Sequence, residues 1–420
     1  MPSLRGLRLL VLVGAVGCGQ DYANDDTPGS GDGGSPSSLR FYEDVAPILN
    51  DHCVSCHRPS GAAPFSLITL DDVLDNAGAI PPNVTTRKMP PYNADDSGAC
   101  NTFEQARWLS DDQIKTITDW LASDRVPGDP TDAPAVPPPP PPLARVDATA
   151  AMTTPYTSDV ALADDYRCFI VDPGVAVDSY VTGFEVRPGA PSIVHHILVF
   201  QLADANAETT AANLDAQTAG PGYTCFGGVG ASANLIGVWA PGMRVASYPA
   251  DTGLPIKAGR KMVLQIHYHS HGTPLTDTTA VDLMLEPTVP NPALLFLMAD
   301  TNLYLPPQMP SVSVSSELQL PAILGQYNVW GVFPHMHTLG KTMRVELDHA
   351  SRTECLIDVP RWDFNWQQGY FYDHAPLVAG GGDTVRINCN YDTTTRGTPT
   401  MWGEGTMDEM CLAFIYVSPY

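Results

Sequence analysis

Basic residues are scarce in this chain of 420 residues, in which 22 Lys and Arg face 46 Asp and Glu. A surface that binds nucleic acid needs a basic patch, so the net charge of −24 argues against nucleic acid as a partner. Long apolar runs are lacking after the N-terminus, and we therefore expect no transmembrane helix. Charged residues make up only 16% of the chain, whereas Pro and Gly number 40 and 35. That balance favours a β-rich, turn-rich body over a helical one.

The first residues indicate export. Two arginines precede the apolar run Leu9–Val16, which is too short to span a bilayer. The run leads into Ala-Val-Gly-Cys, which is similar to a bacterial lipobox, so we predict a signal peptide over 1–18 and lipidation of Cys18. An ordinary secretory signal is the alternative. We expect residues 19–38 to be a flexible tether, and the protein to be periplasmic or held at the outer membrane by its lipid alone.

The clearest motif of the chain is Cys53-Val54-Ser55-Cys56-His57. Two thiols at this spacing add across the vinyl groups of haem, and the adjacent histidine ligates the iron. In an exported chain the motif therefore predicts a covalently attached c-type haem. A thioredoxin-like pair and half of a zinc site are the alternatives, but no partner pair of cysteines follows.

A small α-helical domain over 39–130 is predicted around this motif. Phe41–Asn50 and Asp111–Ser123 have helical spacing, and Ser110 or Asp111 is available as an N-cap of the second helix. Met89 is the only methionine between 39 and 125, and we expect its thioether to be the second axial haem ligand rather than a core side chain. Sequence around the motif is similar to class I cytochrome c domains, in the frame Phe41 to Leu49 and in Ala63-Pro64-Phe65-Ser66-Leu67.

A proline-rich linker over 131–147 ends this segment, because a proline run favours an extended polyproline rod. Beyond it, short alternating or β-branched runs are separated by Pro and Gly turns: Val181–Val186, Ile193–Phe200, Lys261–His269, Tyr327–Val332, Thr342–Leu347, Thr384–Cys389 and Met410–Val417. This pattern predicts two β-sandwiches, over 148–290 and 291–420. The expected fold class is therefore multidomain, with an all-α cytochrome c domain followed by an all-β double jelly-roll.

Three histidine clusters fall on predicted strands: His195-His196, His267 and His335-Met336-His337. Residues i and i+2 share one face of a strand, so His335 and His337 can bind one ion together. Adjacent histidines point to opposite faces, and both reach one ion only at a bulge or a strand end. Imidazole suits copper, zinc or iron, and a thioether, available near the C-terminus, shifts the preference to Cu(I). Satisfied core histidines are the alternative, which the concentration of six of eleven histidines in these motifs, with His269 two residues after His267, disfavours.

Several motifs occur in the same order as in the copper type II, ascorbate-dependent monooxygenases: His-His before apolar residues, Leu-Gln-x-His-Tyr, His-x-His-x-Leu-Gly, and Gly-Glu-Gly-Thr with Asp-Glu-Met-Cys. The chain resembles this family over about residues 150–420. The resemblance implies two jelly-rolls with one copper each. It implies that an electron-transfer copper is held by His195, His196 and His267, and that an oxygen-activating copper is held by His335, His337 and Met410.

The same resemblance places Tyr166 and Gln265 near the coppers. It also implies two disulfides, Cys168 with Cys225 and Cys389 with Cys411. Cys100 and Cys355 are then the two cysteines left over, one in the helical domain and one in the second sandwich. We expect them to pair with each other, because an oxidising compartment favours disulfides.

Two positions depart from the peptide-hydroxylating members of that family. Phe333 stands where they carry an arginine that binds the substrate carboxylate, and Phe414 stands where they carry a tyrosine that helps to bind substrate. Both changes remove polar anchors. We therefore expect a small substrate that is more apolar than a C-terminal glycine peptide.

The sequence thus predicts a copper-dependent monooxygenase that hydroxylates a C–H bond of a small molecule with O2. Its electrons would come from an ascorbate-like reductant or a periplasmic redox protein, through the haem on the same chain, because a tethered donor acts at high effective concentration. The alternatives are a non-catalytic exported electron carrier or copper-binding lipoprotein, and a structural surface protein whose metals only stabilise the fold.

Overall fold

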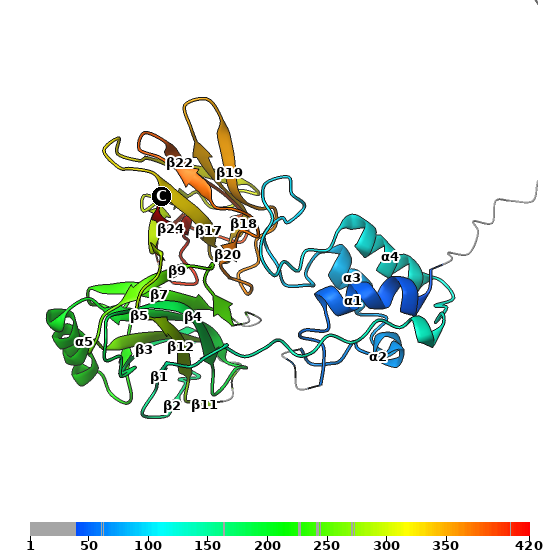
Figure 1. The fold of residues 1–420 in the computed structure, drawn as a ribbon, viewed down its shortest axis with the longest axis horizontal. Coiled ribbons are helices and arrows are strands. Elements are labelled where there is room, and N and C mark those ends of the chain that lie inside the picture. The colour runs from blue at the N-terminus through cyan, green and yellow to red at the C-terminus, as the bar shows by residue number, and fades with distance from the viewer. Residues whose placement is uncertain are drawn as a thin grey trace, which may run out of the picture. The chain divides into compact units, whose positions relative to one another are not determined.

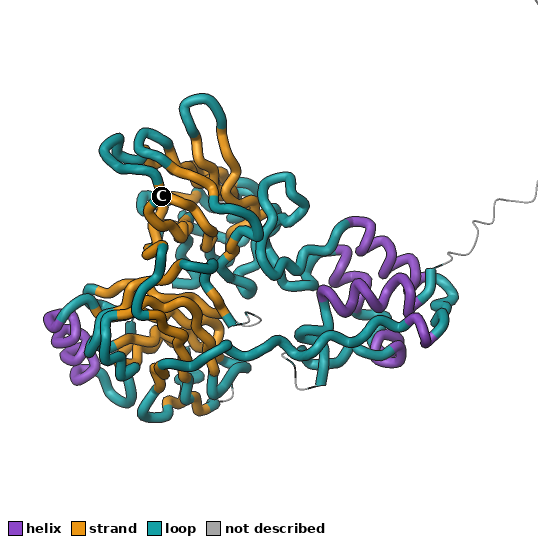
Figure 2. Tube along the Cα trace, viewed as in Figure 1, coloured by secondary structure: helices purple, strands orange, loops and turns teal. Residues whose placement is uncertain are grey.

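The computed structural model describes residues 39–420, except for positions 60, 62, 163, 226–227, 241–242, 244, 270–271, 273 and 404. The expected signal peptide, Cys18 and the tether therefore lie outside the described residues. Figures 1 and 2 show the course of the chain. Apart from α5 (Ala205–Gln217), the α-helices of the described residues all precede residue 123. None of these helices has the length and apolar character that a membrane crossing requires.

The N-terminal segment is helical: a π-helix over Phe41–Val45, α1 (Ala46–His52), α2 (Leu70–Asp75), α3 (Ile80–Thr85), α4 (Asp111–Ala122) and the 3₁₀ turn Pro130–Asp132. Its own small core includes Phe41, Leu49 and Trp120. A capping box begins α4, because the Ser110 hydroxyl accepts from the Gln113 N–H while the Gln113 side chain accepts from the Ser110 N–H. The two predicted helices are confirmed, and α2 and α3 were not predicted.

The first β-sandwich consists of two facing sheets (Figure 1). Its sheet order is β1-β12-β4-β9-β13, with β8 on β4, against β6-β3-β10-β5-β7; β2 and β11 form a separate pair. The bounds are β1 (Ala148–Ala151), β2 (Tyr156–Thr157), β3 (Asp164–Val171), β4 (Ser179–Arg187), β5 (Val194–Leu202), β6 (Tyr223–Thr224), β7 (Ala233–Trp239), β8 (Ala246–Ser247), β9 (Thr252–Ile256), β10 (Met262–His269), β11 (Thr276–Asp277), β12 (Ala280–Glu286) and β13 (Asn291–Pro292). Central β10 is buried along Met262–Tyr268, as its apolar run requires.

The second sandwich pairs the sheet β14-β24-β17-β20, with β21 on β17, with the sheet β16-β22-β18-β19; β15 and β23 form a separate pair. The bounds are β14 (Leu294–Ala299), β15 (Tyr304–Leu305), β16 (Val312–Gln319), β17 (Tyr327–His335), β18 (Gly340–Asp348), β19 (Thr353–Val359), β20 (Tyr370–Phe371), β21 (Leu377–Ala379), β22 (Thr384–Tyr391), β23 (Thr400–Met401) and β24 (Leu412–Pro419). Every second residue of β22 is buried, which is the period of a strand with one face on a core. The predicted β-rich, sandwich-like architecture after the proline-rich linker is confirmed.

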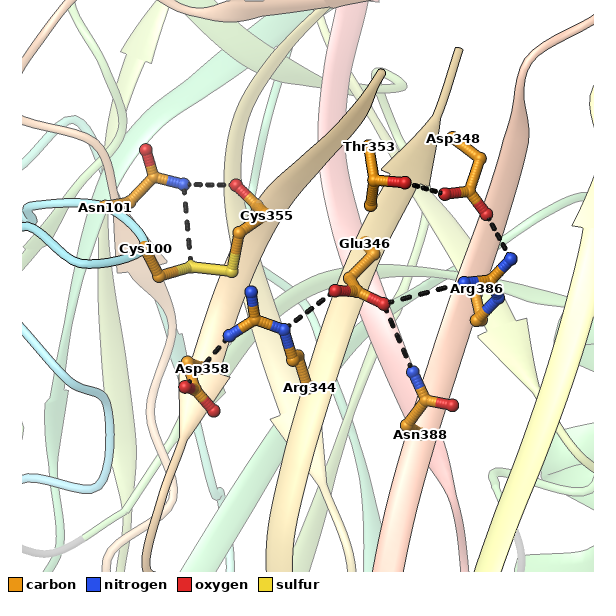
Figure 3. A network of polar contacts seen from close by, with 10 residues as sticks. All are labelled: Cys100, Asn101, Arg344, Glu346, Asp348, Thr353, Cys355, Asp358, Arg386 and Asn388. Atoms are coloured by element: carbon orange, nitrogen blue, oxygen red, sulfur yellow. Dashed lines mark hydrogen bonds and ion pairs between the residues drawn. A yellow bond between two sulfur atoms is a disulfide. The ribbon is translucent and has the colours of Figure 1, made fainter. Parts of the chain in front are cut away.

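Residues 92–107, which we call the strap, leave the helical segment and pack on the second sandwich. Tyr92 and Phe103 are buried in the core of that sandwich. The strap is joined to β19 by the disulfide Cys100–Cys355, the pair expected by parity (Figure 3). Beside it, the Asn101 amide donates to the backbone carbonyls of Cys355 and Leu356. A disulfide and buried side chains of the strap therefore join the helical segment to the second sandwich.

Candidate metal centres

A β-bulge brings the first three histidines to one place. On β5 and β10, His196 pairs with His267, but the next pair joins Val194 to Tyr268, so His195 is the extra residue of a bulge. A bulge turns one side chain toward the face of its neighbour. Adjacent His195 and His196 therefore both face His267, which resolves the conflict that strand alternation raised.

The Nδ1 atoms of these three rings converge. His196 Nδ1 lies 3.2 Å from His195 Nδ1 and 3.4 Å from His267 Nδ1. A tetrahedral ion with metal–nitrogen bonds of about 2.0–2.1 Å separates its nitrogen ligands by about 3.3 Å. The three rings, which we call the first histidine set, thus have the spacing that a first-row metal ion requires.

Burial keeps the first histidine set neutral. Burial lowers the pKa of His195 to about 4, with a further contribution from His267. It lowers the pKa of His196 as well, with contributions from the two other rings and from His335 and His337 of the second sandwich. Neutral imidazoles keep the lone pairs that bind metal. The ring of Phe364 lies 4.9 Å from that of His195 and 6.0 Å from that of His337, so the two sets of histidines lie near each other.

Two neighbours orient His267. Its Nε2–H donates to Asp164 at 2.8 Å, which leaves Nδ1 for the centre of the set. Tyr166 stacks on the same ring, with centroids 4.2 Å apart and planes 7° apart. Gln265 lies on the same strand but donates to the carbonyl of Gly228 and contacts Cys225 instead. Sequence reasoning missed Asp164, which no motif singles out.

The second histidine set consists of His335 and His337, at the end of β17, whose rings lie 5.1 Å apart and nearly perpendicular. The Nδ1–H of His335 donates to Oε1 of Gln367 at 2.5 Å. The Nδ1–H of His337 donates to the carbonyl of Asp408 at 3.1 Å. Both Nε2 atoms are thereby left to bind an ion. Burial lowers the pKa of both rings, that of His335 to about 3.

Met410 belongs beside the second set. Leu412 pairs with His335, and the same antiparallel register continued by two residues places Met410 opposite His337. The Tyr391 hydroxyl donates to the Met410 carbonyl at 2.9 Å, and the neighbouring Cys411 forms a disulfide with Cys389. Together with Cys168–Cys225, both disulfides that the family resemblance implies are present. Both contacts come from β22, which therefore holds the backbone around Met410.

Glu409 is a further part of this site that sequence reasoning missed. Its buried carboxylate accepts the backbone N–H groups of His337, Leu339 and Met410, at 2.9, 2.7 and 3.1 Å. Burial raises its pKa to about 7. Its position directly before the candidate ligand Met410 was the sequence signal that could have identified it. Glu409 therefore fixes the backbone just after β17 and just before β24, where the second set lies.

Replacing Glu409 with alanine should lower the free energy of unfolding by about 3 kcal/mol, because three buried N–H groups lose their acceptor. Urea denaturation followed by circular dichroism measures the change. Glu409→Gln keeps the shape and one acceptor oxygen and should lose less. Glu317→Ala, which removes an exposed acid, is the control. Equal midpoints for Glu409→Ala and Glu317→Ala would refute this role.

The C-x-x-C-H motif lines an apolar cavity of about 340 Å³. Cys53, Cys56 and His57 contribute to its lining, and so does Met89. The Nδ1–H of His57 donates to the Phe65 carbonyl at 3.1 Å, which leaves Nε2 to ligate a metal. A planar apolar group with an iron between a histidine and a thioether fits such a lining.

The thiols of the motif do not resemble a reactive redox pair. Burial, with a smaller contribution from the neighbouring Cys56, raises the pKa of Cys53 to about 12. Thioredoxin-like cysteines need the opposite, a lowered pKa that exposes a thiolate. The surroundings therefore favour attachment of a group over thiol–disulfide exchange.

Comparison with known proteins agrees with the histidine sets. The family model described as copper type II ascorbate-dependent monooxygenase, N-terminal domain, matches residues 154–273, and that of its C-terminal domain matches residues 294–419. The two matches cover more than half of the chain. The chain belongs to the copper type II ascorbate-dependent monooxygenase family. The first histidine set lies in the N-terminal family domain, and the second set in the C-terminal one.

Curated members of this family align with a little over half of the chain. DBH-like monooxygenase protein 1 of Gallus gallus is 24% identical over 54% of this chain and 39% of its own length. Tyramine beta-hydroxylase of Caenorhabditis briggsae is 24% identical over 58% and 42%, and dopamine beta-hydroxylase of Rattus norvegicus is 22% identical over 56% and 39%. The chain thus spans about two fifths of these copper monooxygenases. The helical segment lies outside both matched family domains.

Phe333 and Phe414, the two departures from peptide-hydroxylating members, pair with each other across β17 and β24. Phe333 is buried and lines a small cavity of about 80 Å³ with Phe184, Tyr248 and Phe371. It shares a strand face with His335, two residues away. An apolar surface formed by Phe333 and its neighbours therefore lies beside the second histidine set.

Proposed function

We propose that the protein is a copper-dependent monooxygenase that hydroxylates a C–H bond of a small, fairly apolar substrate with O2. Its electrons pass through a c-type haem on the same chain. The observation that carries the proposal is the convergence of two histidine sets, one in each family domain. Support for the haem comes from the cavity that the C-x-x-C-H motif lines together with Met89.

The two metal centres have different donor sets and different tasks. His195, His196 and His267 hold the electron-transfer copper through three neutral imidazoles. His335, His337 and Met410 hold the other, where the thioether favours Cu(I). Bound copper supplies one-electron chemistry and the reduction of O2. The chain itself orients the rings through Asp164, Gln367 and Asp408, and Glu409 fixes the backbone around them.

The haem module is the proposed electron input. Cys53 and Cys56 attach the haem, and His57 and Met89 are its axial ligands. Bound haem supplies a one-electron carrier whose potential the thioether raises. Export and a lipid on Cys18 place the protein in the periplasm or at the outer membrane, where a small reductant or a redox protein refills the haem.

The substrate proposal rests on Phe333 and Phe414. Neither ring offers a charge or a hydrogen-bonding group to a carboxylate or an amine, and Phe333 lies in an apolar wall. Relatives of this chain are named for hydroxylation of tyramine and dopamine, which carry an amine on an aryl-ethyl body. We propose that this chain takes an aryl-alkyl or similarly apolar substrate without the charged group.

The test uses the copper-loaded full chain with ascorbate, labelled O2 and two probes, ethylbenzene and 2-phenylethylamine. We expect one haem and two coppers per chain, and labelled benzylic alcohol formed faster from ethylbenzene. Absence of haem would overturn the electron input. Copper binding without O2 uptake or product would favour the alternative, an electron carrier or copper-binding lipoprotein, for which the lost polar anchors are the supporting observation.

A further inference from the structure

One loop contacts both histidine sets and also lines the cavity of the C-x-x-C-H motif. Residues 363–368, between β19 and β20, form this loop, which we call the bridging loop. Phe364 stacks on His195 at 4.9 Å between centroids and lies 6.0 Å from the ring of His337. Gln367 accepts the hydrogen bond of His335, and Trp366 lines the cavity of the C-x-x-C-H motif.

Hydrogen bonds hold the bridging loop in place. The buried amide of Asn93, in the strap just after the candidate haem ligand Met89, donates to the carbonyls of Asp363 and Trp366 at 3.1 and 2.9 Å. The Gln367 amide donates to the carbonyl of Phe364 at 2.8 Å. Asn93 therefore joins the bridging loop to the segment around Met89, which lines the cavity of the C-x-x-C-H motif.

We propose that the bridging loop carries the electron from the haem to the copper at His335, His337 and Met410, with Trp366 as the contact on the haem side. This rests on the proposed function, since it needs both cofactors. The step moves one electron: haem Fe(II) becomes Fe(III), and Cu(II) becomes Cu(I). No bond breaks and no proton is transferred.

The path has few gaps. Trp366 and Gln367 are neighbours in the chain, and a single hydrogen bond of 2.5 Å joins Gln367 to His335. Electrons tunnel more readily through covalent bonds and short hydrogen bonds than across empty space. From the same loop, Phe364 stacks on His195 and the Asn365 side chain also interacts with that ring. The bond of 2.5 Å between Gln367 and His335 is the most direct of these links, so the favoured acceptor of the haem electron is the second set.

Spatial continuity alone does not establish coupling, so the test measures the transfer directly. The haem of the full chain, loaded with Cu(II), is reduced by a flash-generated flavin semiquinone under anaerobic conditions. Its reoxidation is then followed by absorbance. We expect a first-order decay that does not depend on protein concentration and that disappears in copper-free protein. This readout needs neither substrate nor turnover.

Trp366→Leu should slow the reoxidation by about tenfold, and Trp366→Phe, which keeps an aromatic ring, by less. The haem potential, measured by spectroelectrochemical titration, should stay unchanged in both variants. Trp330→Phe is the matched control, because Trp330 is a half-buried tryptophan of β17 that donates to Ser418 and is not part of the cavity lining. Its decay should match that of the unmodified chain.

The outcomes separate the two proposals. Decay as fast in Trp366→Leu and Trp366→Phe as in the control would overturn the bridging loop and leave the electron input standing. No copper-dependent decay in the unmodified chain would overturn both. If Trp366→Leu fails to hold haem, Trp366→Phe decides alone: a slower decay at an unchanged potential supports the route, and an equal decay refutes it.

Discussion

Replacing Met410 with alanine should abolish hydroxylation while the chain stays folded. Removal of a group that merely orients a metal ligand costs about 10- to 100-fold in activity, so loss of a ligand should cost about 100-fold or more. The remaining imidazoles of His335 and His337 favour Cu(I) less without the thioether. Product formation from ethylbenzene, with ascorbate as reductant, measures the effect.

Met407→Ala is the matched control, since Met407 lies three residues away with its side chain exposed. It should hydroxylate at the unmodified rate. Copper at the first histidine set should remain bound in Met410→Ala, which electron paramagnetic resonance of the oxidised protein can count. Hydroxylation that survives in Met410→Ala would show that the second metal centre is wrongly assigned.

Replacing both Cys53 and Cys56 with alanine should remove the covalent haem and separate two routes of reduction. A tethered donor gains about 100-fold or more in effective concentration. Turnover with a small redox protein as donor should therefore fall by about that factor. Ascorbate, which can reach the metal centres directly, should still support hydroxylation. Product formation with each reductant measures the two routes.

Ser55→Ala, between the two cysteines, is the control and should keep both the haem and the turnover. Equal turnover of the double variant and this control with the protein donor would contradict the haem as electron input. Loss of turnover with ascorbate as well would mean that the haem module is needed for folding. The midpoint of urea denaturation distinguishes that case.

Sequence periodicity was sufficient for the strands that carry the sites. The runs around His196, His267 and His335 alternate or stay apolar over strand lengths, and each lies in a strand of the structure. The bulge at His195 could not be derived, because it depends on the register between β5 and β10 rather than on either strand alone. Helix α5 was not predicted either. Only Ala207 and Ala211 of this helix are buried, so its sequence lacks the apolar stripe that indicates a helix.

Residues that orient the candidate ligands were harder to predict. Asp164, Gln367 and Glu409 are distant in sequence from the histidines that they contact, and no spacing rule links them. The strap shows the same limit. The proline run suggested a clean boundary after the helical segment, yet Tyr92 and Phe103 complete the core of the second sandwich from within that segment.

The most direct test of the account is a single-turnover experiment on the fully reduced, copper-loaded chain. The protein is mixed rapidly with O2 and ethylbenzene, and haem absorbance and product are followed on the same timescale. The two reduced coppers hold the two electrons that one hydroxylation needs, so we predict that the haem becomes oxidised once product has formed, in a first-order step that is independent of protein concentration. A haem that stays reduced after product has formed would contradict the claim that it supplies electrons to the copper centres.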